Sequence, residues 1–442
     1  MSRILLLMNR QMAFYSLDEL ITHIKSGVPT LYHSSQTSTV IPFEKIAGEL
    51  NADTVLGNLS TIKGSLSFDR ENNLVVEGFV TWKEAKEFCR SHGREIMTSP
   101  TEELAGVLSG IATSATGERS FGFKNLRSQI VSLDYLNYQG KRFTLSAFRP
   151  LELPLDLSGY QKDFSPFENF KNAPFPRLEK ETDLMTGTEG QLGIIVKAVL
   201  QTIVYEEETY LFFLLPKWEE DYSQHLELFH AVQAFRNEVR ACEMIDANSI
   251  AYLPDEKKVG NNQDVIFLEV RKKDFEHVYE NLISKLNLIN EENIFEMNSG
   301  KCRELRVSVP RAIFEVNSRM GVTKKGTDVQ VAPNDFQKLL DFYRSYTKLG
   351  VDYNLFGHFG DAHLHFNFMP DPTKNDFCNQ QLEKLYEQVK IWHGSPFAEH
   401  GIGLLKRKFI KPFYSENQIS VFKELKYNFD PKKQFFNEGF MS

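Results

Sequence analysis

The sequence predicts an α+β protein built from at least two domains. Strand-like segments alternate with helix-like segments along much of the chain, an order in which helices cover one face of a sheet. The 442 residues exceed what one ordinary hydrophobic core accommodates. The composition, 41% hydrophobic and 25% charged, is that of folded globular proteins. A net charge of −8 argues against a global basic field for holding nucleic acid.

The first half of the chain contains a predicted helix start and two predicted hairpins. Ser16 and Glu19 have the spacing of a capping box. Runs of strand-forming residues predict hairpins over 63–80 and 130–147, and Thr81 is expected to cap a helix over 82–92. Residues 151–177 contain four prolines, Pro154, Pro166, Pro174 and Pro176, and predict an irregular loop.

In the second half, strands are expected over 210–215 and 264–271, each followed by a helix, over 222–239 and 274–286. The stretch Gly357–Asn367, GHFGDAHLHFN, has flanking glycines that disfavour a continuous helix. It predicts a strand, a turn and a second strand. His358 and His365 lie on either side of the turn, so their side chains are able to converge.

The four cysteines are scattered and form no C-x-x-C pair. This argues against an iron–sulfur cluster, a zinc ribbon and a disulfide scaffold, and favours a reducing compartment. The apolar run Ile4–Met8 is shorter than the hydrophobic region of a signal peptide, and no stretch reaches the roughly 18 apolar residues of a membrane span. We expect a cytoplasmic protein. Peripheral association with a membrane, such as the inner membrane, is the alternative.

Two glycine-rich segments are candidates for ligand binding. Gly106–Gly122 is composed mainly of small residues, which let a backbone approach a bulky ligand and offer amides and hydroxyls to phosphate. A flexible linker is the alternative, although the interspersed Val, Ile and Phe residues argue against it. Asp183–Ile194 is a glycine-rich turn before an apolar strand and is a weak signal alone.

Five segments together resemble one family. In chain order they read GVLSGIATSATGERSFGF, DLMTGTEGQLGI, GHFGDAHLHFN, AEHGIG and FDPKKQFFNEGF. They resemble flavoproteins of the vanillyl-alcohol oxidase type, in particular the branch of D-lactate, glycolate and D-2-hydroxyglutarate dehydrogenases. The resemblance implies a two-subdomain FAD-binding domain of the PCMH type over 1–206. It also implies an α+β substrate cap over 207–395 and a helical C-terminal segment, 396–442, that returns to the flavin.

The resemblance implies FAD as cofactor. The residues expected to bind it are Thr37, Ser38, Pro100, Ser109, Gly110, Thr113, Ser114, Gly117, Gly122, Glu189, Gly190, Ile194 and Asn437. One phosphate loop departs from the family pattern, because His33–Ser38 reads HSSQTS where relatives usually read RGGGTS. Without glycine, each positive φ angle costs roughly 1 kcal/mol or more. Because Thr37 lies near the position of the flavin-linking histidine of some relatives, FAD is expected to be non-covalent.

Two histidines and a glutamate form the ligand set of an open catalytic zinc site, although histidines near turns are more often solvated or hydrogen-bonded in the core. The resemblance implies a divalent metal such as zinc on His358, His365 and Glu399. The family position that matches His363 is usually asparagine, so His363 is left outside the expected ligand set.

The remaining site residues also follow from the resemblance. His400 is expected to take the proton of the substrate hydroxyl, since an imidazole suits that task at neutral pH. Arg306 matches an arginine whose guanidinium binds the substrate carboxylate, with a surface salt bridge as the alternative. Lys325 is the expected substrate lysine, although the register leaves Lys324 open, and Asn367 is expected to hydrogen-bond the substrate.

These expectations describe FAD-dependent oxidation of a D-2-hydroxy acid to the 2-oxo acid. The acceptor would be a quinone, a cytochrome or an electron-transfer flavoprotein, since no G-x-G-x-x-G motif for NAD follows a strand. Two alternatives stay open: another flavin chemistry, of the sterol-reductase or alkyl-transfer type, and a flavin-free binding or assembly subunit. The basic run Leu405–Lys411 fits a solvated helix face, with contact to a membrane or an acceptor as the alternative. A homodimer also stays open.

Overall fold

The computed structural model describes residues 10–43, 45–260 and 262–442. The run Ile4–Met8 lies outside the described residues. The chain forms two compact units. The first holds the described residues up to Gly117 together with Asn125–Tyr205 and Glu399–Ser442, and the second holds Glu118–Lys124 and Glu206–Ala398. In the part of the chain that is described, no helix has both the length and the apolar character to cross a membrane.

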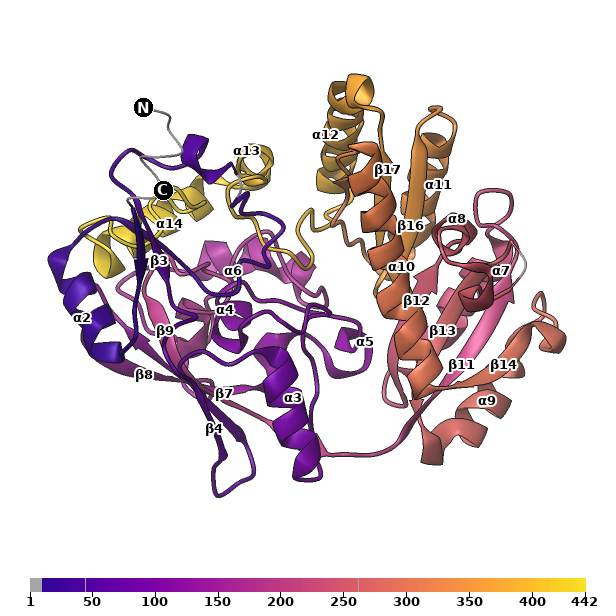
Figure 1. Ribbon diagram of the computed structural model, residues 1–442, viewed down its shortest axis with the longest axis horizontal. Coiled ribbons are helices and arrows are strands. Elements are labelled where there is room, and N and C mark those ends of the chain that lie inside the picture. Colours follow the sequence, from indigo (N-terminus) through magenta and orange to yellow (C-terminus); the bar gives the residue numbers. More distant parts are fainter. Residues whose placement is uncertain (1–9, 44, 261) are drawn as a thin grey trace. The chain divides into compact units, whose positions relative to one another are not determined.

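The first unit is built on short sheets (Figure 1). One is parallel, in the order β1-β3-β2, and another is antiparallel, in the order β4-β5-β9-β7-β8. Strands β6 and β10 pair separately. The strands are β1 (Gln11–Ala13), β2 (Thr30–His33), β3 (Val55–Asn58), β4 (Ser65–Phe68), β5 (Leu74–Glu77), β6 (Arg94–Ile96), β7 (Ile130–Leu136), β8 (Arg142–Ser146), β9 (Ile194–Leu200) and β10 (Thr202–Val204). The two predicted hairpins are therefore confirmed as β4–β5 and β7–β8.

The helices of the first unit are α2 (Leu17–Ser26), α3 (Trp82–Ser91), α4 (Val107–Ala112), α6 (Ser158–Phe164), α13 (Arg407–Ile410) and α14 (Glu416–Phe429). The predicted caps are confirmed, since Ser16 accepts the Glu19 N–H and Thr81 forms a capping box with Glu84. The prediction of an irregular loop over 151–177 is wrong for α6. Tyr160 and Phe164, four residues apart, are buried on its inner face against Phe175, and this packing stabilises a short helix between the prolines.

The second unit is one seven-stranded sheet with helices on both faces (Figure 1). Its order is β14-β11-β13-β12-β16-β17-β15, and neighbouring strands are antiparallel. The strands are β11 (Glu208–Leu215), β12 (Val239–Ile245), β13 (Asp264–Arg271), β14 (Ile294–Asn298), β15 (Lys325–Gly326), β16 (Asp352–His358) and β17 (His363–Met369). The helices are α5 (Ser120–Phe123), α7 (Ser223–Val232), α8 (Ala247–Ala251), α9 (Phe275–Ile283), α10 (Ser299–Met320), α11 (Phe336–Thr347) and α12 (Asn375–Ile391).

The helix predicted over 222–239 is too long. It ends at Val232, because the segment Val239–Ile245 is buried at every position, Arg240 and Glu243 included, and pairs within the sheet as β12. A strand buried on both faces lacks the alternation of apolar and polar side chains that marks a half-buried strand.

Alternate residues of β17 contact different helices. Phe366 packs its ring on Tyr343 and Tyr346 of α11. Met369 belongs to the core cluster of the opposite face, with Leu305 of α10. Because side chains alternate along a strand, His363, His365 and Asn367 lie on the α10 face, the same face as Met369.

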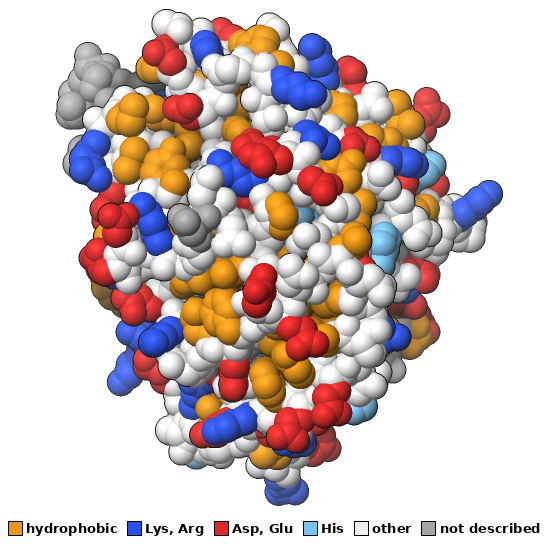
Figure 2. Space-filling model, turned by 90° about the vertical axis from the view of Figure 1, so that its right-hand side faces the viewer, with side chains coloured by type: hydrophobic (Ala, Val, Ile, Leu, Met, Phe, Trp, Pro, Cys, Tyr) orange, Lys and Arg blue, Asp and Glu red, His pale blue; other side chains and the backbone are white. Residues whose placement is uncertain are grey.

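On the surface shown in Figure 2, acidic and basic side chains are interspersed, and neither sign dominates.

Candidate functional site

A cavity of about 460 Å³ lies inside the first unit. Small-molecule pockets are commonly about 300–1,000 Å³. Its walls come from α2, β2, the ends of β5 and β9, and α4, and four glycines line it: Gly78, Gly106, Gly190 and Gly193. A Cβ on Gly106 would lie 3.0 Å from Ser34 Oγ and 3.1 Å from Ser109 Oγ, so glycine here lets two hydroxyls approach the wall closely. A wall of this kind fits the phosphates and ring of a nucleotide cofactor.

Of the residues predicted to bind a cofactor, five line this cavity: Ser109, Thr113, Glu189, Gly190 and Ile194. The structure places the others differently. Gly110 packs against the Trp82 indole, Gly117 lies against the Ser99 carbonyl, and the Ser114 hydroxyl donates to Asn172 Oδ1. Pro100 and Asn437 are half-buried outside the cavity lining.

Gly122 belongs to the second unit. A Cβ there would lie 2.5 Å from the Val239 carbonyl oxygen and 2.9 Å from Arg240 Cα. The absence of a side chain lets α5 pack directly on the backbone of β12. In this structure Gly122 therefore has a packing role, and its cofactor role stays a prediction.

The loop His33–Ser38 reaches the cavity through its first residues. His33 and Ser34 line the cavity, whereas Thr37 and Ser38 are exposed. Gln36 has a φ of 56°, so one of the three positions that are glycine in relatives takes the left-handed conformation. This costs roughly 1 kcal/mol for a residue with a side chain. Burial lowers the pKa of His33, although its hydrogen bond with the Ser34 carbonyl opposes the shift, so His33 is neutral at pH 7.

Glu189 connects the cavity wall to the AEHGIG segment. Its Oε1 accepts the N–H of Ile402 at 2.6 Å, and both carboxylate oxygens lie within 3.2 Å of the Gly403 nitrogen. Burial raises the pKa of Glu189, an effect that these backbone N–H groups oppose. The contact positions the loop that follows His400, whose own side chain is exposed.

The second candidate site is a buried cluster of histidines in the second unit. The predicted strand–turn–strand is confirmed as β16, a turn at Phe359–Asp361, and β17. His358 pairs with His363 across the ladder, so both side chains lie on one face. His365, two residues further along β17, lies on that face as well. His363 was not among the ligands predicted from the sequence. The pairing of His363 with His358 in the strand register is the observation that would have added it.

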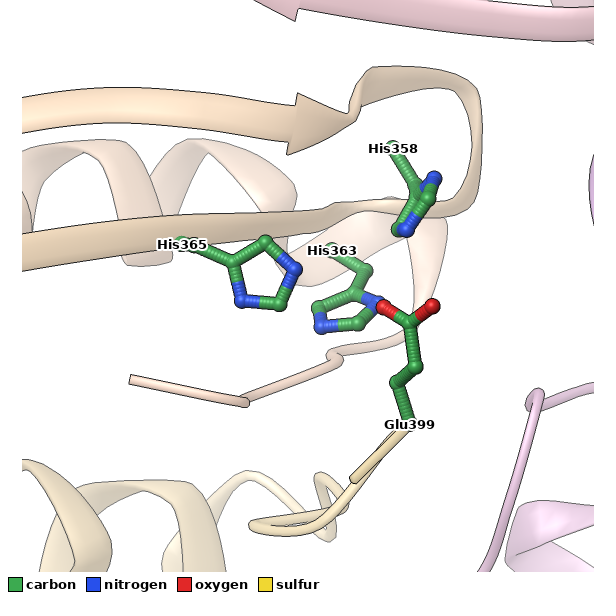
Figure 3. A group of neighbouring side chains, drawn as sticks. All are labelled: His358, His363, His365 and Glu399. Carbon is green, nitrogen blue, oxygen red and sulfur yellow. The ribbon is translucent and has the colours of Figure 1, made fainter. Parts of the chain in front are cut away.

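Glu399 directly follows the last residue of the second unit, Ala398, whose N–H donates to the Asp328 carbonyl at 2.9 Å. One ligand atom from each of His358, His363, His365 and Glu399 lies within 4.8 Å of the others, and all four residues are buried. Figure 3 shows the three rings and the carboxylate gathered around one region. The predicted ligands His358, His365 and Glu399 are therefore close together.

Each histidine also has a partner outside the cluster. His358 Nδ1 donates to Glu243 Oε1 at 2.8 Å, and His365 Nδ1 donates to the Thr327 carbonyl at 2.9 Å. The acceptors of His358 and His365 place the proton on Nδ1 and leave Nε2 as the ligand atom, as in metal sites of proteins. His363 Nε2 lies at an ion-pair distance, 3.2 Å, from Asp328 Oδ1. The donor set therefore fits a divalent metal of the zinc type.

The predicted substrate residues also belong to the second unit, on α10, β15 and β17. Arg306, on α10, forms an ion pair with Glu118, which is the alternative that the sequence left open. Lys325 is paired with Phe368, on the α11 face, whereas Gly326 is paired with Asn367. Lys324 therefore lies on the face of the histidines, with its ammonium 6.0 Å from the centre of the Phe356 ring. Which of the two lysines contacts the substrate stays a prediction.

Asn367 is buried, and its amide donates to Asn354 Oδ1 at 2.8 Å and to the His365 carbonyl. Its nitrogen is therefore already engaged within the sheet, and a role toward substrate stays a prediction.

Comparison with known proteins identifies the family. Residues 207–439, more than half of the chain, match the family model described as "FAD linked oxidases, C-terminal domain". Residues 25–146 match the model described as "FAD binding domain". The chain belongs to the FAD-linked oxidases, with an N-terminal FAD-binding domain and a C-terminal FAD-oxidase domain. The distant homology to D-lactate, glycolate and D-2-hydroxyglutarate dehydrogenases is confirmed.

The relatives are distant. D-lactate dehydrogenase [cytochrome], mitochondrial, of Kluyveromyces lactis is 21% identical over 82% of this chain and 60% of its own length. D-lactate dehydrogenase of Archaeoglobus fulgidus is 22% identical over 85% of this chain and 79% of its own length. The chain thus spans less than two thirds of the first of these. A solved structure of alkyldihydroxyacetonephosphate synthase is 14% identical, with a TM-score of 0.66 over 96% of this chain and 75% of that one, and shares the fold.

Proposed function

We propose that the protein is an FAD-dependent oxidoreductase that converts a D-2-hydroxy acid to the 2-oxo acid. The observation that carries this proposal is the buried cluster of His358, His365 and Glu399, formed by two of the five segments that resemble hydroxy-acid dehydrogenases. The names of the distant relatives, which include D-lactate and D-2-hydroxyglutarate dehydrogenases, support the substrate class.

In this proposal FAD binds non-covalently at the cavity of the first unit and, when bound, accepts the hydride from the α-carbon of the substrate. His400 takes the proton of the hydroxyl group. Arg306 exchanges the Glu118 carboxylate for the carboxylate of the substrate, which a guanidinium binds in bidentate fashion. A divalent metal on the histidine cluster would polarise the hydroxyl and lower its pKa.

The electron acceptor is proposed to be a quinone, a cytochrome or an electron-transfer flavoprotein. The name of the Kluyveromyces lactis relative, which includes a cytochrome, supports this class of acceptor. A cytoplasmic location, with contact to the inner membrane, is part of the same proposal.

A dye-reduction assay tests the reaction class. The purified protein, supplemented with FAD and zinc, is incubated with D-lactate, glycolate or D-2-hydroxyglutarate and an artificial electron acceptor, and L-lactate serves as the control. Reduction with at least one of the three substrates and none with L-lactate is expected. A flavin-containing protein that is silent on all three would support another flavin chemistry. A protein that takes up no FAD would support a binding or assembly subunit. The absence of glycine from the loop His33–Ser38 is the reason for considering this alternative.

A further inference from the structure

Three buried imidazoles lie in contact on one hairpin. The ring centres of His358 and His363 are 5.3 Å apart, those of His363 and His365 are 4.6 Å apart, and those of His358 and His365 are 5.9 Å apart. His363 is the most central of the three and is fully buried. Imidazole nitrogens grouped in this way are donors that one divalent cation can bind together.

His363 shares its surroundings with the two expected ligands. His358 Nδ1 donates to Glu243 Oε1 and His365 Nδ1 donates to the Thr327 carbonyl, while His363 Nε2 lies at an ion-pair distance, 3.2 Å, from Asp328 Oδ1. These oxygens come from β12 and from the segment after β15, elements that the sheet holds in place. The register of the hairpin, which pairs His363 with His358, places the His363 ring in the same group.

The spacing of the ligand atoms fits a single ion. Ligands about 2.0–2.1 Å from a tetrahedral zinc lie about 3.3 Å from one another. The four ligand atoms here are within 4.8 Å of one another, and the three rings and the carboxylate are gathered around one region (Figure 3).

We infer that His363 is a metal ligand, so that the site contains three imidazoles and one carboxylate. The role of the metal in this inference rests on the proposed function. The number of ligands is measured independently of turnover. His358, His363, His365 and Glu399 would hold the ion, which would supply Lewis-acid polarisation of a substrate oxygen. Three imidazoles also favour zinc or a similar transition metal over magnesium and calcium.

X-ray absorption fine structure of the zinc-loaded full-length protein tests this inference, because it counts the imidazole rings around the ion. Three rings are expected in the wild type and two in His363→Asn, which keeps a polar side chain of smaller size. Competition titration with a zinc chelator is expected to show at least about a 10-fold loss of zinc affinity in His363→Asn, since losing even a partner of a ligand costs that much. His358→Asn is the positive control, and His230→Asn, at an exposed position of α7, is the matched negative control.

Two results would overturn the inference: two imidazoles in the wild type, or unchanged zinc affinity in His363→Asn while His358→Asn loses affinity. Melting curves of the metal-free variants identify any variant that fails to fold, and in that case the count of rings in the wild type decides. A protein that shows three rings but no activity toward hydroxy acids would leave this inference standing and remove the proposed function.

Discussion

The carboxylate of Glu189 lies 2.6 Å from the backbone nitrogen of Ile402. A half-buried acid in the cavity wall of the first unit thereby holds the loop that follows His400, although Glu189 and Ile402 are more than two hundred positions apart in the chain. Hydrogen bonds therefore connect the wall of the expected cofactor site directly to the loop that follows the expected base. This relationship gives the first prediction.

Replacing Glu189 by alanine leaves the N–H groups of Ile402 and Gly403 without this acceptor, at about 1–3 kcal/mol for each buried group. The loop should lose its position, and kcat should fall by at least about 10-fold. Glu189→Gln keeps one acceptor oxygen and should recover part of the activity. Steady-state kinetics and flavin content of both variants are the measurements. Equal kcat in Glu189→Ala and wild type would remove the positioning role.

His400→Ala should abolish turnover while FAD stays bound, because the variant removes the group that takes the hydroxyl proton. General-base catalysis typically contributes about 10²–10⁴-fold, and the loss should fall in that range or above. Rapid-mixing measurements of flavin reduction separate this step from later ones. Unchanged turnover would take His400 out of the mechanism.

The pair of Arg306 and Glu118 separates a substrate role from a structural one. Arg306→Ala should raise KM for the hydroxy acid by about 10-fold or more, since a charge-assisted hydrogen bond contributes about 1.5–3 kcal/mol. Glu118→Gln breaks the ion pair but keeps the guanidinium, and its KM should stay equal to or below that of the wild type. Similar KM values in all three proteins would show that the ion pair is only structural.

Gly122→Ala should destabilise the second unit without weakening FAD binding. The new Cβ would meet the Val239 backbone, and overpacking of this kind typically costs about 1–3 kcal/mol. Gly48→Ala, where a Cβ meets nothing within 4 Å, is the control. Melting temperature and FAD titration are the measurements. Normal stability combined with weaker FAD binding would restore the cofactor role predicted for Gly122 from the sequence.

Asp246 should make stability depend on pH. Burial, together with the charge of neighbouring Asp264, raises the pKa of Asp246 to about 8. A carboxyl group with a higher pKa in the folded state stabilises the fold below pH about 4, and this contribution is lost as the pH rises toward 8. The melting temperature of the wild type should therefore fall relative to that of Asp246→Asn between pH 5 and pH 8, by the equivalent of up to about 4 kcal/mol. Parallel pH profiles of the two proteins would contradict this.

Local chemistry in the sequence predicted the helix caps, the hairpins and the turn before His363 correctly. Each of these depends on residues only a few positions apart, such as Thr81 with Glu84. The choice between Lys324 and Lys325 depends instead on the register of β15 against β17, which no local pattern encodes. Gly122 was assigned to a cofactor because its small neighbours resemble a ligand loop, and its contact with β12 lies more than a hundred residues away.

The cluster of histidines illustrates the same limit. His358 and His365 were expected to converge because a turn separates them, whereas His363 was excluded because relatives usually have asparagine there. Its position opposite His358 follows from the length of the turn, Phe359–Asp361, which sets the register of the ladder.

The most direct test of the account is the visible absorption spectrum of the purified protein, recorded without oxygen and with FAD added back if the protein is pale. The account predicts the bands of bound oxidised flavin and their loss when a D-2-hydroxy acid is added. A protein that shows no bound flavin after incubation with FAD would contradict the account.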